Sequence, residues 1–284
     1  MKNRLNKFLL YLLTGTLLLA VMVFLAFFFQ ERFIFLSESL PQNFVYQYET
    51  PSKEVFLTTS DDVKLNALHF KKKNSIGVVL YFHGNAGNLE RWAGLTSHLR
   101  QYSYDLFLLD YRGYGKSGGS YDEAKMYEDA LLAYDYLNGL YDADSIIIYG
   151  RSLGSTFGTY VAANRTSKYL ILETPFYGLK QMLRDAYFFF AIENFLTYEF
   201  PTFLFADQVK CPIYMFHGTD DMIVPYEQSL RLKKVFNSNQ IELITVDGGH
   251  HNDLIKFDIY HEWIERIFNQ QFQDTPLDQT ALFE

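Results

Sequence analysis

The sequence predicts an α/β domain built on a mostly parallel β-sheet with helices on both faces. Short apolar runs alternate with longer stretches of helical spacing from Val55 to Phe268, after an initial pair of strands. Strands that alternate with helices run parallel, because each helix carries the chain back to the end at which the previous strand began. The chain has 284 residues, 49% of them hydrophobic, which is enough for one core of this kind.

The expected elements follow in order along the chain. A hairpin comes first, with strands at Val55–Thr59 and Leu65–Phe70 around the turn Ser60-Asp61-Asp62. The remaining strands are expected at Ile76–Phe82, Asp105–Asp110, Ile146–Tyr149, Tyr169–Leu172, Ile213–Phe216 and Ile241–Val246. The helices are expected at Leu89–Tyr102, Tyr121–Leu140, Ser152–Asn164 and His251–Phe268. A sheet of this type presents its reactive groups at the carboxyl ends of its strands.

The N-terminal region predicts a membrane anchor. Residues Phe8–Phe29 carry no charge and are almost wholly apolar, and about 22 helical residues reach about 33 Å, enough to cross a bilayer core. The run ends in bulky phenylalanines, which favours an uncleaved transmembrane helix over a cleaved signal peptide. Lys2, Arg4 and Lys7 precede it, which predicts a single-pass protein with its N-terminus inside and its catalytic domain on the outer, extracytoplasmic side.

Four segments are expected. They are an anchor at residues 1–30, a linker at 31–54, a folded domain at 55–270 and a flexible tail at 271–284. A stretch rich in phenylalanine and tyrosine, about residues 179–207, interrupts the alternation of strands and helices. We interpret it as a small helical cap that packs aromatic side chains on the core and lines an apolar substrate pocket or dips toward the bilayer.

Composition excludes some classes of function. The net charge is −8 and no basic stripe is present, so a nucleic-acid partner is not expected. The single cysteine, Cys211, rules out a disulfide framework within the chain and is interpreted as a small packed residue.

The motif Gly150-Arg151-Ser152-Leu153-Gly154 follows an apolar strand and precedes a helix. This G-x-S-x-G pattern in a strand–turn–helix context is a nucleophile elbow, which holds a serine hydroxyl above the end of a sheet. Ser152 is therefore the candidate nucleophile. A serine needs a base to take its proton and an acid to orient the base, and on this topology they follow in the order acid, then histidine.

Candidates for both partners occur in that order. The loop after Ile213–Phe216 contains Asp220 and Asp221, and the loop after the last strand contains His250 and His251. Glu173, at the end of an earlier strand, is a further possible acid, although we expect it to hydrogen-bond local backbone instead.

The oxyanion hole requires two backbone N–H groups. Leu153 follows the nucleophile and supplies one, and the loop His83-Gly84-Asn85-Ala86-Gly87-Asn88 follows a buried strand and supplies the other, with Asn85 as the expected donor. His83 is expected to brace this loop. The glycine-containing run Asp110–Ser117 lacks the P-loop pattern and is interpreted as a structural turn below the site.

Together these runs resemble the α/β-hydrolase superfamily, and within it a branch of membrane-anchored serine hydrolases related to Bem46-like and serine-aminopeptidase (S33)-like proteins. The resemblance covers about Val55 to Phe268. It implies an α/β-hydrolase fold that needs no metal or organic cofactor. It also implies Asp221 as the acid, three residues before Val224 of a Val-Pro pair, and His251 as the base, directly before Asn252-Asp253. The branch includes enzymes that remove palmitate from protein cysteines.

We therefore expect a membrane-anchored serine hydrolase that cleaves ester or thioester bonds through an acyl-enzyme, with a small-molecule or acylated, lipid-like substrate. One alternative is a peptidase or amidase of the serine aminopeptidase type, for which Glu193 and Glu199 could supply charge that binds a free amine. The other is a non-catalytic binding protein on the same fold.

Overall fold

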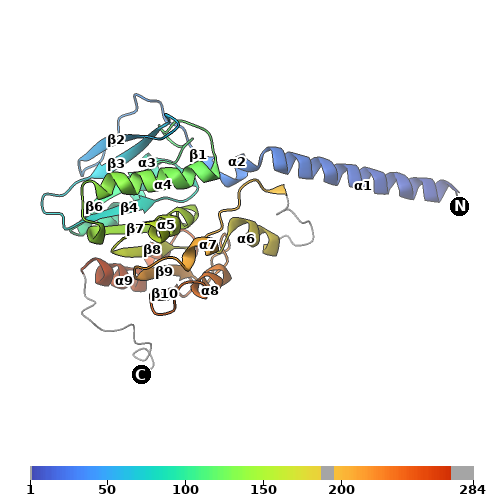
Figure 1. The fold of residues 1–284 in the computed structure, drawn as a ribbon. Helices are drawn as coiled ribbons and strands as arrows, with labels where there is room; N and C mark the ends of the chain where they lie inside the picture. The colour runs from blue at the N-terminus through green and yellow to red at the C-terminus, as the bar shows by residue number, and fades with distance from the viewer. Residues whose placement is uncertain (1, 187–194, 270–284) are drawn as a thin grey trace, which may run out of the picture.

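An eight-stranded sheet forms the centre of the domain, as the alternating pattern predicted (Figure 1). The computed structural model describes residues 2–186 and 195–269. In their spatial order the strands are β10 (Ile241–Val246), β9 (Ile213–Gly218), β8 (Tyr169–Glu173), β7 (Ile146–Arg151), β4 (Val78–Phe82), β6 (Asp105–Leu109), β3 (Lys64–Phe70) and β2 (Ser52–Thr58). The strands from β10 to β6 run parallel, whereas β3 is antiparallel to both β6 and β2.

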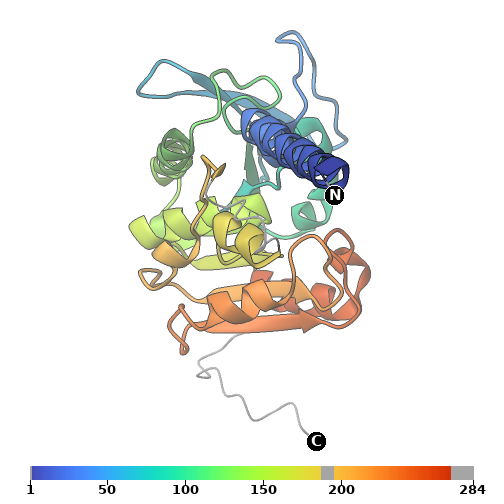
Figure 2. The same cartoon turned by 90° about the vertical axis from the view of Figure 1, so that its right-hand side faces the viewer.

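Helices cover both faces of the sheet and divide the core into two layers (Figures 1 and 2). On one face pack α4 (Glu123–Asn138), α5 (Leu153–Asn164) and α8 (Glu227–Lys233), and on the other pack α3 (Leu89–Leu95) and α9 (Asp258–Phe268). The parallel strands are buried on both sides, which is why they read as continuous apolar runs rather than alternating ones.

Two helix boundaries differ from expectation. The closing helix, predicted over His251–Phe268, begins only at Asp258 and follows a short 3-10 turn at Leu254–Lys256. The reason is local, because the Asp253 carboxylate accepts the His250 backbone N–H at 2.7 Å and turns the chain before the helix can start. The helix expected at Leu89–Tyr102 breaks into α3 and a 3-10 helix, Ser97–Gln101.

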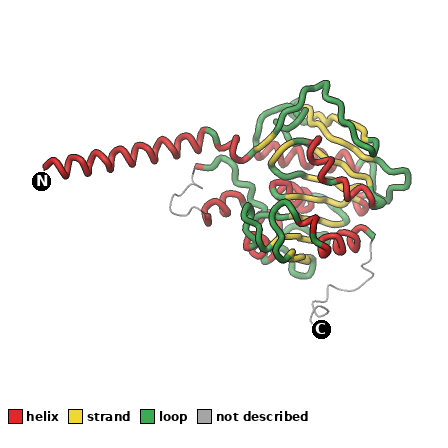
Figure 3. The backbone as a smooth tube through the Cα atoms, turned by 180° about the vertical axis from the view of Figure 1, so that it is seen from behind, coloured by secondary structure: helices red, strands yellow, loops and turns green. Residues whose placement is uncertain are grey.

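The N-terminal helix α1 (Lys2–Phe28) projects from the domain as a single rod (Figure 3). Its 27 residues span about 40 Å. The window Arg4–Val21 has a mean hydropathy of 1.3 and none of it is buried against the domain. This helix is long and apolar enough to cross a membrane, a property that an anchor and a signal sequence share.

The segment after α1, expected to be an irregular linker, contains a short helix α2 (Gln30–Ile34) and a strand β1 (Leu36–Ser37). Strand β1 pairs in parallel with β5 (Ala86–Gly87), just beyond the carboxyl end of β4. On the other side, the Tyr198 hydroxyl donates to Glu31 at 2.6 Å. The base of α1 is therefore fixed at the edge of the sheet where the parallel strands end.

The aromatic insertion is described in part. It contains α6 (Leu179–Ala186) and α7 (Phe203–Ala206), while residues 187–194 of the expected cap and the whole of the expected tail, residues 271–284, lie outside the described residues. Tyr198 and Phe200 are buried, and both pack their rings edge-on against Phe35. This part of the insertion therefore packs against the segment that follows α1.

Candidate active site

Ser152 lies on the sharp turn between β7 and α5. Its backbone has φ 50° and ψ −116°, in the left-handed half of conformational space that non-glycine residues rarely enter. Such a conformation costs about 1–3 kcal/mol and persists only where the surrounding structure imposes it.

Close packing at the two glycines of the motif imposes this backbone conformation on Ser152. A Cβ added to Gly154 would lie 2.0 Å from the carbonyl oxygen of Phe82, at the end of β4, and one added to Gly150 would lie 2.5 Å from the carbonyl oxygen of Gly154. The start of α5 therefore packs directly on two strand ends, at a distance that leaves no room for a side chain. This close approach fixes Ser152 next to the loop that follows β4.

Ser152, His251 and Asp221 form one chain of hydrogen bonds. His251 Nε2 lies 3.1 Å from Ser152 Oγ, and His251 Nδ1 lies 2.7 Å from Asp221 Oδ2. An ionised carboxylate can only accept, so Nδ1 carries the proton and Nε2 is free to accept from the serine hydroxyl. Asp221 and His251 are 4% and 8% exposed, and the chain is thus largely shielded from water.

The surroundings of Asp221 keep it ionised. Burial acts to raise its pKa, but hydrogen bonds from His217 and His251 and from the backbone N–H of Val224 hold the pKa below its ordinary value. The N–H groups of Ile223 and Val224 both donate to Oδ1 at 2.8 Å. A carboxylate with this many donors is positioned to stabilise an imidazolium on His251.

The neighbouring candidates lie outside this chain. Asp220 is exposed, and its carbonyl oxygen accepts from His250 Nδ1 at 2.8 Å. His250 is also exposed and faces this loop. The structure thus brings Asp221 and His251 to Ser152 and leaves Asp220 and His250 at the surface.

Glu173 differs from expectation, because its carboxylate binds side chains rather than local backbone. It lies 3.2 Å from Arg151 Nε and accepts the Tyr149 hydroxyl at 2.6 Å. Tyr149 and Arg151 both belong to β7, the strand that pairs with β8 and delivers Ser152. Glu173 therefore supports the elbow from the adjacent strand β8.

Arg151 is a residue that the sequence analysis missed. Besides Glu173, its guanidinium donates to the carbonyl oxygen of His251 and to Asn252 Oδ1, both at 3.1 Å. Burial acts to lower the pKa of Arg151, but the Glu173 carboxylate raises it above its usual range, so the side chain stays charged. Arg151 thereby connects the elbow to the loop that carries His251. The available signal was a charged residue inside an apolar strand–turn segment.

The loop after β4 lies beside Ser152. A Cβ on Gly84 would be 3.7 Å from Ser152 Cβ. The side-chain amide of Asn85 donates to the Ile34 carbonyl at 3.0 Å, so it points toward the segment after α1. The Asn85 backbone N–H donates to no backbone or side-chain acceptor in the part of the chain that the structure describes. The Leu153 N–H opens α5 and has no acceptor within that helix. The backbone N–H groups of Asn85 and Leu153 thus both have no acceptor of these kinds among the described residues, and both belong to segments beside Ser152.

His83 and two tyrosines of the run Asp110–Ser117 support this loop through hydrogen bonds and ring contacts. His83 is fully buried, contacts the Gly84 carbonyl oxygen through Nδ1 at 2.6 Å and stacks on Trp92. The hydroxyls of Tyr111 and Tyr114 donate to the carbonyl oxygens of His83 and Asn85, at 2.6 and 2.9 Å. These bonds turn the loop carbonyls inward.

The structure shows neither a metal-binding cluster nor an exposed thiol among residues 2–186 and 195–269. In these ranges no group of three or more His, Cys, Asp or Glu side chains is placed to hold a metal ion. Cys211 is buried, and burial raises the pKa of its thiol, as for a packed structural residue.

Comparisons with known proteins agree with this fold. A family model described as serine aminopeptidase, S33, matches residues 73–205. Protein bem46 of Schizosaccharomyces pombe is 28% identical over 250 residues, which cover 83% of this chain and 81% of that protein. An uncharacterized protein of Acanthamoeba polyphaga mimivirus is 27% identical over 221 residues, which cover 70% of this chain and 75% of that protein.

Solved structures give the same result. An esterase of Pyrococcus furiosus superposes with a TM-score of 0.64 at 20% identity, over 82% of this chain and 96% of that one. Est1E of Butyrivibrio proteoclasticus, solved with ferulic acid, has a TM-score of 0.60 at 21% identity, over 75% of this chain and 99% of that one. At these identities the likeness shows the fold.

Because the elbow is closely packed, we expect one added methyl group at Gly154 to destabilise the protein strongly. In Gly154→Ala the new Cβ meets backbone atoms that cannot rotate away, so we expect the free energy of unfolding to fall by about 3 kcal/mol. Gly94→Ala is the matched control, because a Cβ there meets nothing within 4 Å in helix α3, and it should gain about 0.5–1 kcal/mol. Urea unfolding of the full chain in detergent measures both. Equal stability of Gly154→Ala and wild type would contradict a rigid elbow.

Proposed function

We propose that this chain, which belongs to the α/β-hydrolase superfamily with the Bem46-like serine hydrolases, cleaves carboxylic ester or thioester bonds while anchored in a membrane by α1. The observation that carries the proposal is the hydrogen-bonded chain from Ser152 through His251 to Asp221. It joins three separate loops at one edge of the sheet, in the arrangement that activates a serine.

In the proposed mechanism Ser152 Oγ attacks the acyl carbon while His251 Nε2 takes the hydroxyl proton. Asp221 holds the resulting imidazolium through Nδ1. The backbone N–H groups of Leu153 and Asn85 donate to the oxyanion of the tetrahedral intermediate. His251 then gives its proton to the departing alcohol or thiol, leaving an acyl-serine. A water molecule, deprotonated by His251, attacks this ester and releases the carboxylic acid and free Ser152.

Two alternatives remain to be compared with this proposal. The first alternative is a peptidase or amidase, and the description of the matching family model supports it. Of the two carboxylates considered for binding a free amine, Glu199 is already paired with Lys180, from whose Nζ it accepts at 2.6 Å, while Glu193 lies outside the described residues. A non-catalytic binding protein would have no use for an aligned Ser152, His251 and Asp221, and this favours an enzyme.

The membrane part of the proposal rests on α1. With Lys2, Arg4 and Lys7 at its start, the positive-inside rule places the N-terminus inside and the catalytic domain on the extracytoplasmic side. We propose a small-molecule or acylated, lipid-like substrate, no nucleic-acid partner and no metal or organic cofactor. The pairing of β1 with β5 supports a site that faces the membrane surface, since it places the base of α1 beside the Asn85 loop.

A covalent probe tests the nucleophile. We expect the full chain in detergent to be labelled by a fluorophosphonate, and Ser152→Ala to be unlabelled, because the probe reacts only with an activated serine. Ser145→Ala is the control, since Ser145 precedes the same strand β7 at its opposite end. An unlabelled wild-type protein, or equal labelling of Ser152→Ala, would overturn the proposed function.

The two adjacent histidines give a test of the base. His251→Gln is expected to lower the kcat for an acetyl ester by about a thousandfold, because it removes the proton acceptor of Ser152. His250→Gln keeps the triad intact and should leave the rate close to that of wild type. Steady-state hydrolysis by both variants distinguishes them. A loss confined to His250→Gln would show that the base is misassigned.

Arg151 is proposed as a positioning residue for His251. In Arg151→Lys the amine can still pair with Glu173 but cannot also reach the His251 loop. We expect the kcat to fall about tenfold, in line with the loss of a charge-assisted hydrogen bond, with KM little changed and fluorophosphonate labelling slowed in parallel. Arg165→Lys is the control, because Arg165 pairs with Asp135 at the surface. A changed melting temperature with an unchanged kcat would indicate a purely structural role.

A further inference from the structure

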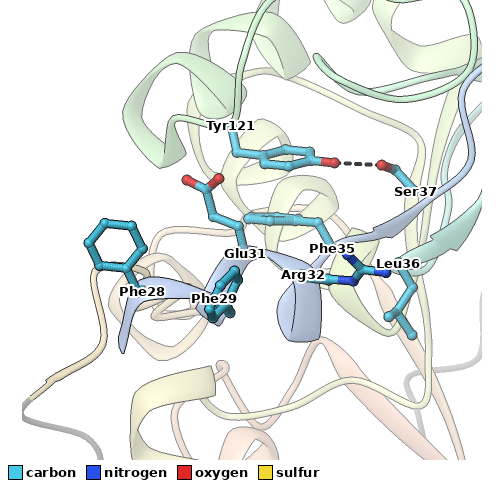
Figure 4. Close-up of a pocket in the computed structure, with 8 residues that line it drawn as sticks. All are labelled: Phe28, Phe29, Glu31, Arg32, Phe35, Leu36, Ser37 and Tyr121. Carbon is cyan, nitrogen blue, oxygen red and sulfur yellow. Dashed lines mark hydrogen bonds between the residues drawn. The ribbon is translucent and has the colours of Figure 1, made fainter. Parts of the chain in front are cut away.

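A cavity of about 590 Å³ lies where α1 meets the domain (Figure 4). This volume is within the range of about 300–1,000 Å³ that is typical of ligand pockets. Its lining comes from the end of α1, from α2 and β1, and from the approach to α4. None of the proposed catalytic residues lines it.

Apolar side chains form part of the walls of the cavity. Phe28 and Phe29 form one side, and Leu36 lies across from them (Figure 4). The rings of Phe35 and Tyr121 are stacked with centroids 4.2 Å apart and form a flat wall between these two ends. Phe28, Phe29 and Leu36 are half or more exposed, so apolar surface at this place is left without protein cover. An apolar ligand would gain by covering it.

The polar groups of the cavity differ in whether the protein satisfies them. Glu31 accepts the Tyr198 hydroxyl at 2.6 Å, and Ser37 and Tyr121 are hydrogen-bonded to each other through their hydroxyls (Figure 4). The Arg32 guanidinium is exposed and has no hydrogen-bond or ion-pair partner among the residues that the structure describes. The lining thus carries a carboxylate that already accepts a hydrogen bond, Glu31, and a guanidinium whose donors are all unused within the described part of the chain, Arg32. These unused donors suit a ligand with an apolar body and an anionic group.

The lining of the cavity extends from the base of α1 toward the loop that lies beside Ser152. Phe28 is the last residue of α1, so in a membrane-spanning α1 the Phe28 side of the cavity lies at the bilayer boundary. At the other side, the Leu36 N–H donates to the Asn85 carbonyl oxygen at 3.0 Å. Asn85 belongs to the loop whose Gly84 approaches Ser152. A chain that enters from the bilayer therefore meets the oxyanion loop at the far side.

We infer that this cavity binds an acyl chain of an anionic membrane phospholipid and that Arg32 binds the lipid phosphate. The inference rests on the proposed function, because the ester of the bound chain is the bond that Ser152 attacks. The Ser152 Oγ–acyl bond forms as the ester C–O bond breaks, and the glycerol oxygen leaves with the proton from His251. Water then cleaves the acyl-serine, and a fatty acid and a lysophospholipid are the products.

Photo-crosslinking tests the cavity without catalysis. The probe is phosphatidylglycerol with a diazirine on one acyl chain, in phosphatidylglycerol vesicles that contain full-length Ser152→Ala. We expect peptide mapping to place adducts on Phe35, Leu36 or Tyr121 in addition to α1. Leu36→Trp, added to Ser152→Ala, fills the cavity and should reduce these adducts about tenfold, or about 1.4 kcal/mol of binding. Leu36 is 50% exposed, so the larger ring does not enter the core.

Leu140→Trp is the matched control for crosslinking. Leu140 is 51% exposed and lies after α4, near the start of β7 and thus at the opposite edge of the sheet. It should leave the adducts unchanged. Adducts confined to α1, or equal adducts in Leu36→Trp and Leu140→Trp, would overturn the assignment of the cavity.

Activity on matched substrates tests the chain and the headgroup. In an otherwise wild-type chain, Leu36→Trp should keep acetyl ester hydrolysis and fluorophosphonate labelling but lose about tenfold in kcat/KM on hexadecanoyl phosphatidylglycerol. Arg32→Gln should raise KM for phosphatidylglycerol vesicles and not for neutral phosphatidylcholine vesicles. Lys73→Gln, which removes an exposed cation between β3 and β4, is the control for overall charge.

These outcomes distinguish a failure of the proposed function from a failure of the proposed acyl site. Absence of labelling and of acetyl ester hydrolysis would overturn the proposed function, whereas cavity adducts would still support the binding site. A Leu36→Trp profile of activity against chain length that matches wild type would overturn the acyl site alone. Cleavage of a palmitoyl-cysteine peptide with no cleavage of phospholipid would overturn the choice of a lipid ester.

Discussion

The close contact between the start of α5 and the end of β4 is the constraint on which the site depends. Without side chains at Gly150 and Gly154, the helix approaches Phe82 closely enough to hold Ser152 at φ 50°. The cost of this conformation, about 1–3 kcal/mol, is offset by burial, since β4, β7 and most of α5 are part of the core. The same contact places the first amide of α5 beside the Asn85 loop, so that one packing arrangement sets the positions of the proposed nucleophile and of the amides proposed as oxyanion donors.

Buried charges connect this rigid elbow to the loops that carry its proposed partners. Asp221 is held by backbone amides and two histidines, and Arg151 is held between Glu173 and the His251 loop. Taking such charges from water is costly, and removing one partner would leave the other unpaired in the interior. The network therefore ties the ends of β7 and β8 to the loop after β10. It explains how loops far apart in sequence keep their spacing.

Local signals predicted most of the fold, and non-local contacts account for what they missed. The apolar runs located β4 and β6 to β10, and the elbow motif identified Ser152, because each of these signals depends on neighbouring residues. The expected local backbone role of Glu173 is wrong because its partner Arg151 lies 22 positions away in sequence, across a strand pairing. Strand β1 has no periodic signal and exists only through its pairing with Ala86 and Gly87. The closing helix was predicted too early because the Asp253 turn competes with it.

The segment after α1, which the sequence did not predict to contain regular structure, determines how α1 is attached beside the site. A flexible linker would let the domain turn freely above a bilayer, and its catalytic edge would face the membrane only part of the time. Strand β1 and the Glu31–Tyr198 bond instead fix the base of α1 beside the Asn85 loop. If α1 spans the membrane as proposed, the bilayer surface itself bounds the entrance to Ser152. A substrate already dissolved in that bilayer then needs no passage through water, because tethering replaces diffusion in solution with a high effective concentration. The geometry of attachment would therefore select substrates before any contact inside the pocket does.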